Sequence, residues 1–313
     1  MTDVSHAVKV LTVADLQGSR ARARKERTVR LVFLTCAVLS IVISAAIIWS
    51  LAAEAWTFIS QVELSKLWTD GWFPRRDMYD LRTIVVGSFL VTAVALLVAI
   101  PLGLGAAIYL SEYASRRVRR VLKPTLEILA GIPSVVLGFF ALTWISPEIV
   151  QRLVSDAPQS NMAAAGIGVG ILIVPLIASV SEDAMSAVPR ALREAAYGVG
   201  ARKITTTVRV VVPAAVSGIV AALIIAVSRA IGETMVVFIA AGGTGGSLFE
   251  TDIFQPGTTM TAAMASVASG TDQVRGAGLT FQSLFFVGLL LFLMTLVLNL
   301  LADRFVARVR QRY

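Results

Sequence analysis

Long apolar segments separated by short polar ones run along most of the chain, and this pattern predicts membrane-spanning helices. A helix needs about 20 predominantly apolar residues to cross roughly 30 Å of hydrocarbon. Six segments meet this requirement, namely residues 31–53, 83–111, 128–147, 161–181, 210–241 and 276–302. The pattern therefore predicts an all-α integral membrane protein with six transmembrane helices.

The first apolar segment has two interpretations, a permanent anchor or a cleaved signal peptide. The Arg-rich residues 20–30 before it and the Ala53-Glu54-Ala55 sequence after it resemble the flanks of a signal peptide. The apolar part of a signal peptide is about 7–15 residues long, however, and this segment is longer. Its length favours an uncleaved anchor.

The composition agrees with lipid as the main solvent. Hydrophobic residues make up 56% of the chain, charged residues 15%, and the mean hydropathy is +0.78. Soluble domains carry about 25% charged residues. The net charge of +8 raises the question of nucleic acid, but Lys and Arg lie in short clusters between apolar segments. We therefore expect membrane lipid and no nucleic acid as a partner.

The positive charges also predict the orientation. With six spans both termini share one side, which receives 21 of the 28 Lys and Arg residues, whereas the acidic residues divide almost evenly. Cytoplasmic loops carry such an excess, so we expect both termini in the cytoplasm and the protein in the cell membrane. The expected parts are a cytoplasmic arm, a first helix with its external loop, a core of five spans and a cytoplasmic tail, at residues 1–30, 31–82, 83–305 and 306–313.

Chemistry of its own is not expected of this chain. Cys36 and His6 are the single residues of their kinds, so an intrachain disulfide or a His/Cys metal centre is excluded. The glycine run at residues 242–246 lacks the Lys-Ser/Thr ending of a phosphate-binding P-loop. We expect no catalytic residue, no metal and no cofactor in this chain.

Two charged residues interrupt the fifth apolar segment. A charge at the centre of a membrane helix costs about 2.5–3.5 kcal/mol, so it is seldom without a role. Arg229 and Glu233 are four residues apart and are expected to meet on one helix face. They form either a structural ion pair or an anion site, since a guanidinium matches phosphate oxygens. Thr234, and Ser134 after Pro133, are candidate hydroxyl contacts of the same pathway.

Small residues and tryptophans give two further expectations. Gly166 and Gly170 have the spacing that lets membrane helices approach closely. Tryptophans often anchor helices at the membrane interface. We expect that role for Trp49, Trp56, Trp68 and Trp72.

A short amphipathic helix is predicted between Pro189 and Gly200, on the cytoplasmic side. Proline suits the first turn of a helix and glycine its end. Residues of its apolar side, Leu192, Ala195, Ala196 and Val199, recur at helical spacing. Such a helix either enters a groove on another protein or lies on lipid headgroups.

This loop resembles that of the binding-protein-dependent ABC importer permeases. Their motif is E-A-A, three residues, G, nine residues, then I-x-L-P. Here it reads Glu194-Ala195-Ala196, Gly200 and Val210-Val211-Val212-Pro213, with valines for Ile and Leu. The resemblance implies a type I (MetI-like) permease fold and a loop that docks onto ATPase subunits.

The segment Arg229-Ala230-Ile231-Gly232-Glu233-Thr234 resembles the phosphate-specific permeases, the PstC and PstA family. Residues 132–136 and Met235-Val236 are more similar to PstC. The resemblance implies that Arg229 and Glu233 lie in a phosphate path. It also implies as partners a PstA-like second permease, two PstB-like ATPases that bind ATP and Mg²⁺, and a PstS-like external phosphate-binding protein. The alternatives are another oxyanion such as sulfate or molybdate, a stand-alone channel or ion-coupled carrier, and a membrane scaffold without transport.

Overall fold

The computed structural model describes residues 20–242, 246–269 and 279–309. The N-terminal arm up to residue 19, residues 276–278 of the sixth predicted span and the tail from residue 310 lie outside these ranges. Five described helices are long and apolar enough to cross a membrane, and a bent pair makes a sixth. The prediction of six transmembrane helices is confirmed on this count.

The chain divides into two compact units, Met1–Leu51 and Ala52–Tyr313. The described part of the first unit is helical and belongs to helix α2, Arg20–Gln61, which continues into the second unit. The helix is longer at both ends than the predicted 31–53, because residues 20–30 and 54–61 contain no proline or glycine. Its apolar side chains between Leu31 and Ile48 are exposed, as expected for a helix in lipid.

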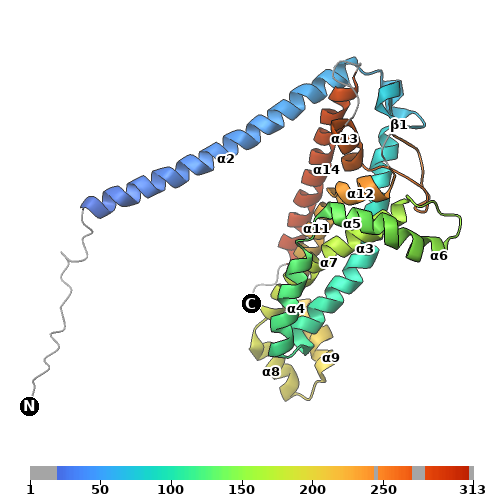
Figure 1. The fold of residues 1–313 in the computed structure, drawn as a ribbon. Coiled ribbons are helices and arrows are strands. Elements are labelled where there is room, and N and C mark those ends of the chain that lie inside the picture. Colours follow the sequence, from blue (N-terminus) through green and yellow to red (C-terminus); the bar gives the residue numbers. More distant parts are fainter. Residues whose placement is uncertain (1–19, 243–245, 270–278, 310–313) are drawn as a thin grey trace, which may run out of the picture. The chain divides into compact units, whose positions relative to one another are not determined.

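The core of the second unit is built on two helices, α3 (Leu81–Ile108) and α7 (Met162–Ser186), which pack along each other (Figure 1). A Cβ atom at Gly166 would lie 2.6 Å from Val94 Cβ, and one at Gly170 would lie 2.9 Å from the Ala95 carbonyl oxygen. Larger side chains would therefore separate the helices. The predicted packing role of both glycines is confirmed.

The third span is displaced from its predicted position. Helix α4 (Arg116–Leu129) ends before the Gly131-Ile132-Pro133 turn, and the span runs from Ser134 to Leu153. It consists of α5 (Ser134–Phe140), a π-helical stretch (Ala141–Val150) and α6 (Gln151–Leu153). The prediction of 128–147 was wrong because Pro133 disfavours a helical residue before it. Residues 128 and 129 accordingly close α4.

The fifth span is broken twice. Its first piece comprises α9 (Lys203–Thr206), a π-helical stretch (Thr207–Val211) and α10 (Val212–Ala214). A bend of 70° separates this piece from α11 (Val216–Ile231). A second break at residues 232–234 precedes α12 (Met235–Ala240), so the predicted continuous span 210–241 was wrong. Proline at 213 and glycine at 232 are the residues that disfavour a continuous helix here.

A small antiparallel sheet was not predicted. Strands β1 (Gly71–Phe73), β2 (Met78–Tyr79) and β3 (Ser247–Leu248) lie in the order β2-β1-β3. Trp72 is 2% exposed, and its ring lies edge-on to Tyr79. Its predicted interfacial role was therefore wrong, whereas Trp49, Trp56 and Trp68 are exposed.

Two helices follow β3 in the sequence. They are α13 (Met260–Ala268) and α14 (Thr280–Val309), which pack against each other. Helix α14 also packs against α11, the helix that carries Arg229. This contact brings the last span beside the charged residues of the fifth.

Candidate functional site

Arg229 lies in the last turn of α11, and its side chain is exposed. Among the described residues, none forms an ion pair or a side-chain hydrogen bond with it. The neighbouring Ser228 donates a hydrogen bond to Asn299 Oδ1 on α14, at 2.8 Å. Arg229 is therefore an unpaired cation at the end of a membrane helix.

The predicted Arg229–Glu233 ion pair is wrong. Helix α11 ends at Ile231, so Glu233 leaves the helical spacing that would bring the two side chains together. Instead, a Glu233 carboxylate oxygen lies 3.5 Å from the backbone nitrogen of Val236, in the first turn of α12. The carboxylate faces the start of the next helix.

The break between α11 and α12 also contains the Glu233 carbonyl and the Thr234 hydroxyl, two polar groups of the predicted pathway segment. The Glu233 carbonyl accepts a hydrogen bond from the Thr261 hydroxyl at 2.7 Å. The Thr234 hydroxyl donates to the nearby Gly232 carbonyl at 3.3 Å. Both Glu233 and Thr234 are half-buried. The break thus presents backbone carbonyls outside the helices and one carboxylate, that of Glu233.

Ser134 begins α5 and is half-buried. Its helix packs against α12, where a Cβ atom at Gly138 would lie 3.1 Å from the Met235 carbonyl oxygen. The structure thus packs α5, which begins with Ser134, against α12, the helix that follows the break. In the described part of the chain, no hydrogen bond joins Ser134 to Arg229, Glu233 or Thr234.

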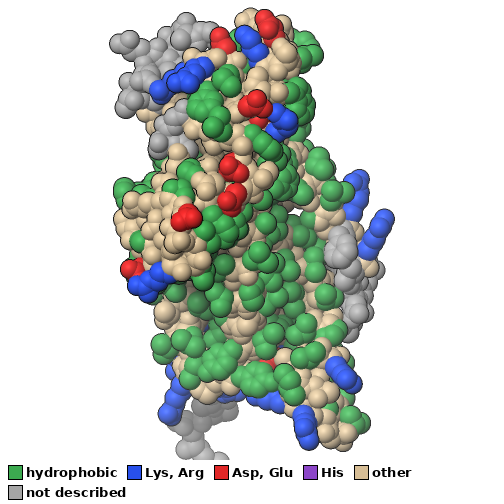
Figure 2. Space-filling view, turned by 90° about the vertical axis from the view of Figure 1, so that its right-hand side faces the viewer, with side chains coloured by type: hydrophobic (Ala, Val, Ile, Leu, Met, Phe, Trp, Pro, Cys, Tyr) green, Lys and Arg blue, Asp and Glu red, His purple; other side chains and the backbone are tan. Residues whose placement is uncertain are grey.

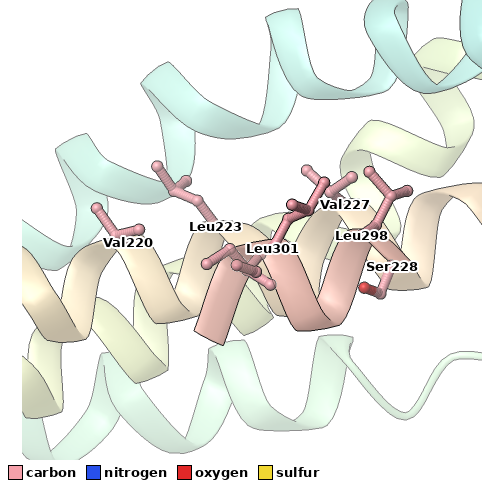
Figure 3. Close-up of a pocket in the computed structure, with 8 residues that line it drawn as sticks. Val220, Leu223, Val227, Ser228, Leu298 and Leu301 are labelled. Carbon is pink, nitrogen blue, oxygen red and sulfur yellow. The ribbon is translucent and has the colours of Figure 1, made fainter. Parts of the chain in front are cut away.

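An apolar groove of about 440 Å³ lies between α11 and α14 (Figure 3). Ser228 is at one end of it, and no charged side chain lines it. The groove therefore lacks the donors that an anion requires. Its lining residues are Val220, Leu223, Ile224, Val227, Ser228, Leu298, Leu301 and Ala302.

The predicted cytoplasmic helix is present as α8 (Arg190–Gly198). Pro189 precedes it, and Gly200 follows it with φ +79°, a conformation that favours glycine. Glu194, Ala195 and Gly200 are exposed, Ala196 is half-buried, and Pro213 is exposed at the start of α10. The predicted apolar side is only partly turned inward: Leu192 packs against the inner cluster, but Val199 is 86% exposed.

Comparison with known proteins identifies the family. The family described as "Binding-protein-dependent transport system inner membrane component" matches residues 99–313. The chain is 32% identical to the phosphate transport system permease protein PstC of Mesorhizobium japonicum, over 93% of this chain and 96% of that protein. The chain belongs to this family of transport permeases. It is a multi-pass membrane component of an ABC importer.

Further relatives support this membership. The permease is 32% identical to the phosphate transport system permease protein PstA 1 of Mycobacterium tuberculosis, over 67% of each chain. Its fold matches a chain of the MetNI methionine ABC transporter with a TM-score of 0.52, at 19% identity, over 72% of this chain and 92% of that one. The predicted resemblance to PstC and PstA and the MetI-like fold are confirmed.

The sequence did not predict a charge network at the C-terminal end of α7 in this permease. Glu182 is 0% exposed, and its carboxylate accepts hydrogen bonds from Arg119 and Lys123 of α4 and from Ser186. Lys123 also reaches Asp183 at 2.5 Å. Figure 2 shows further Lys and Arg side chains around the lower end of the molecule. The acidic pair directly after the apolar segment was the available signal.

The network changes the proton affinity of Lys123. Burial alone lowers the pKa of Lys123, but hydrogen bonds and charge attraction from Asp183 and Glu182 outweigh burial. The pKa is therefore raised above its ordinary value, and the ammonium form is stabilised.

A second charged contact attaches α8 to the core. One Arg193 guanidinium nitrogen donates to Glu112 Oε1 at 2.8 Å and to the Met185 carbonyl at 2.8 Å. The other terminal nitrogen donates to the Val188 carbonyl at 2.7 Å. These contacts connect α8 to Glu112, shortly after α3, and to the C-terminal end of α7.

Proposed function

We propose that this permease is the PstC-like translocation subunit of an ATP-driven importer of inorganic phosphate. The single observation that carries the proposal is an arginine that has no partner among the described residues, at the end of a membrane helix and beside the break between α11 and α12. Relatives that cover nearly the whole chain are phosphate transport system permeases, which supports phosphate as the anion. The function that these residues fit best is transport in which phosphate passes Arg229.

The chemistry of Arg229 suits this role. A guanidinium stays charged in a dry site and offers several donors to a tetrahedral oxyanion. Glu233 is turned toward α12, so an arriving phosphate need not displace an ion pair. Thr234 and Ser134 are proposed as hydroxyl contacts of the same pathway.

The proposed coupling runs through the α8 loop. Glu194, Ala195, Ala196 and Gly200, with Pro213 at the end of the motif, would contact two PstB-like ATPases, which bind ATP and Mg²⁺. The 86% exposed Val199 offers an apolar contact for such a partner. The permease itself would hold no cofactor and catalyse no reaction. A PstA-like second permease, a PstS-like external protein and cytoplasmic termini complete the proposal.

Arg229→Gln tests the proposal in the complete transporter reconstituted in proteoliposomes. Loss of the charge should abolish phosphate uptake while assembly with the partners is retained, because a neutral amide lacks the attraction that replaces phosphate hydration. Arg152→Gln is the matched control, since Arg152 is exposed and pairs with Glu148 at the C-terminal end of the third span. Normal uptake by Arg229→Gln would refute the phosphate path.

Two further measurements separate the alternatives. Competition by unlabelled sulfate or molybdate distinguishes other oxyanions, and we expect neither to reduce phosphate uptake. Purified permease without ATPases should not transport phosphate. Transport by the permease alone would favour a channel or an ion-coupled carrier.

A further inference from the structure

The break between α11 and α12 is held by a segment that lies well downstream in the sequence. The carbonyl of Glu233 belongs to neither helix, and its hydrogen-bond donor is the Thr261 hydroxyl in the first turn of α13, at 2.7 Å. Lipid offers no donor to a free carbonyl. Thr261, which is 6% exposed, therefore satisfies a backbone group that the break would leave unpaired.

Thr261 is itself fixed by its neighbour Thr259. The two hydroxyl oxygens lie 3.0 Å apart, and Thr259 Oγ1 accepts from the Ala262 N–H at 3.2 Å. A hydroxyl has one proton to donate. Because Thr261 gives its proton to Glu233, Thr259 must donate to Thr261. The N-cap of α13 thereby sets the orientation of the Thr261 hydroxyl.

The same segment is seated on α3. A Cβ atom at Gly87 would lie 2.2 Å from the Thr258 carbonyl oxygen, so no larger residue fits there. The Met260 N–H donates to Ser88 Oγ at 3.0 Å, and both residues are buried. Contacts thus continue without interruption from α3 through residues 258–261 to Glu233.

We infer that Thr261 is a positioning residue of the translocation site. It fixes the Glu233 carbonyl, and with it the path of the chain between Arg229 and α12. The hydroxyl is neutral, so it can hold the break without competing with Arg229 for an anion. This inference rests on the proposed function for its consequence in transport, but not for its structural effect.

Thr261→Val tests the inference in the complete reconstituted transporter, because valine keeps the shape and removes the hydroxyl. Leaving a buried carbonyl unsatisfied should lower the maximal rate of phosphate uptake about tenfold. Thr261→Ser keeps the donor and should stay within about twofold of the wild type. Thr295→Val is the matched control, since that hydroxyl bonds the carbonyls of Leu291 and Phe292 in its own helix. Equal loss in Thr261→Ser and Thr261→Val would show that the hydroxyl is not the cause.

A labelling experiment reports on the break itself. Met235 is exposed at the start of α12, and Met235→Cys combined with Cys36→Ser leaves one cysteine in this chain, whose labelling is measured on the separated permease band. Its reaction rate with a membrane-impermeant thiol reagent should change about fivefold or more when Thr261→Val is added. An unchanged rate overturns the inference, whether or not uptake falls.

The proposal of a phosphate path at Arg229 and the inference about Thr261 can be refuted independently. Normal phosphate uptake in Arg229→Gln would remove the phosphate path and leave the labelling result as the test of Thr261. Altered labelling with serine rescue would support Thr261 even then.

Discussion

The C-terminal end of α7 and the break after α11 are both junctions between elements, but different interactions stabilise them. At the end of α7, a buried carboxylate binds an arginine and a lysine of another helix. At the break, a hydroxyl binds a backbone carbonyl. Charge is concentrated at the first junction, whereas the described residues near the second include one cation without a partner, Arg229, and the carboxylate of Glu233.

This difference follows from what each junction must do. A charge network is stabilising where its outer members reach water, and Arg119 and Lys123 are partly exposed. Beside a proposed anion path, additional cations would retain the anion by charge attraction. Additional carboxylates would form ion pairs with Arg229. A neutral hydrogen bond fixes the chain there without either effect.

Glu182→Gln should have the largest effect on stability. The amide cannot balance the two cations that face it, and we expect a loss of about 2 kcal/mol, less than for a fully enclosed pair because both cations can turn toward water. The midpoint of thermal unfolding in detergent measures it. Asp183→Asn is the control, since Asp183 is 63% exposed and should contribute about 0–1 kcal/mol. Equal shifts would contradict the assignment of Glu182 as the centre of the network.

Arg193→Gln should weaken coupling more than stability. Its guanidinium holds α8 against Glu112 and two backbone carbonyls. Without these contacts we expect phosphate uptake per ATP hydrolysed to fall several-fold, with a stability loss of about 1 kcal/mol. Both rates are measured in proteoliposomes, with Arg190→Gln, an exposed residue of the same helix, as control. An unchanged ratio of phosphate uptake to ATP hydrolysis would argue against α8 as the element that couples the ATPases to transport.

The smallest effect is expected from pH. The pKa of Lys123 is raised in the folded state above its ordinary 10.5. Its contribution is therefore fully present below about pH 10 and is lost as pH rises through the folded-state pKa. The stability difference between wild type and Lys123→Met should stay constant from about pH 7 to 9 and shrink at higher pH. A difference that already shrinks on going from pH 7 to 9 would contradict the raised pKa.

The number of spans and a close helix contact at Gly166 and Gly170 could be predicted, because hydropathy and glycine spacing report directly on lipid and on helix packing, whereas α3 as the partner helix could not. Breaks were harder to place. Pro133 lies within the predicted span 128–147, whereas it stands at the junction of α4 and α5. Single residues of this kind permit a break, and tertiary contacts decide where it falls.

The residues of the candidate site stay a prediction, and the geometry expected for Arg229 and Glu233 was wrong. Spacing alone put Arg229 and Glu233 on one helix face, but α11 ends between them. The partner that stabilises this ending, Thr261, is far away in the sequence and carries no motif. The buried network at Glu182 was missed for the same reason, because its cations belong to α4.

The small antiparallel sheet has a consequence for the order of synthesis. β1 lies between β2, a few residues downstream, and β3, which follows only after α12. Chains emerge from the N-terminus, so the hairpin of β1 and β2 is complete long before its third strand exists. The sheet therefore closes late, after the first five spans have been synthesised, and until then one edge of β1 remains open.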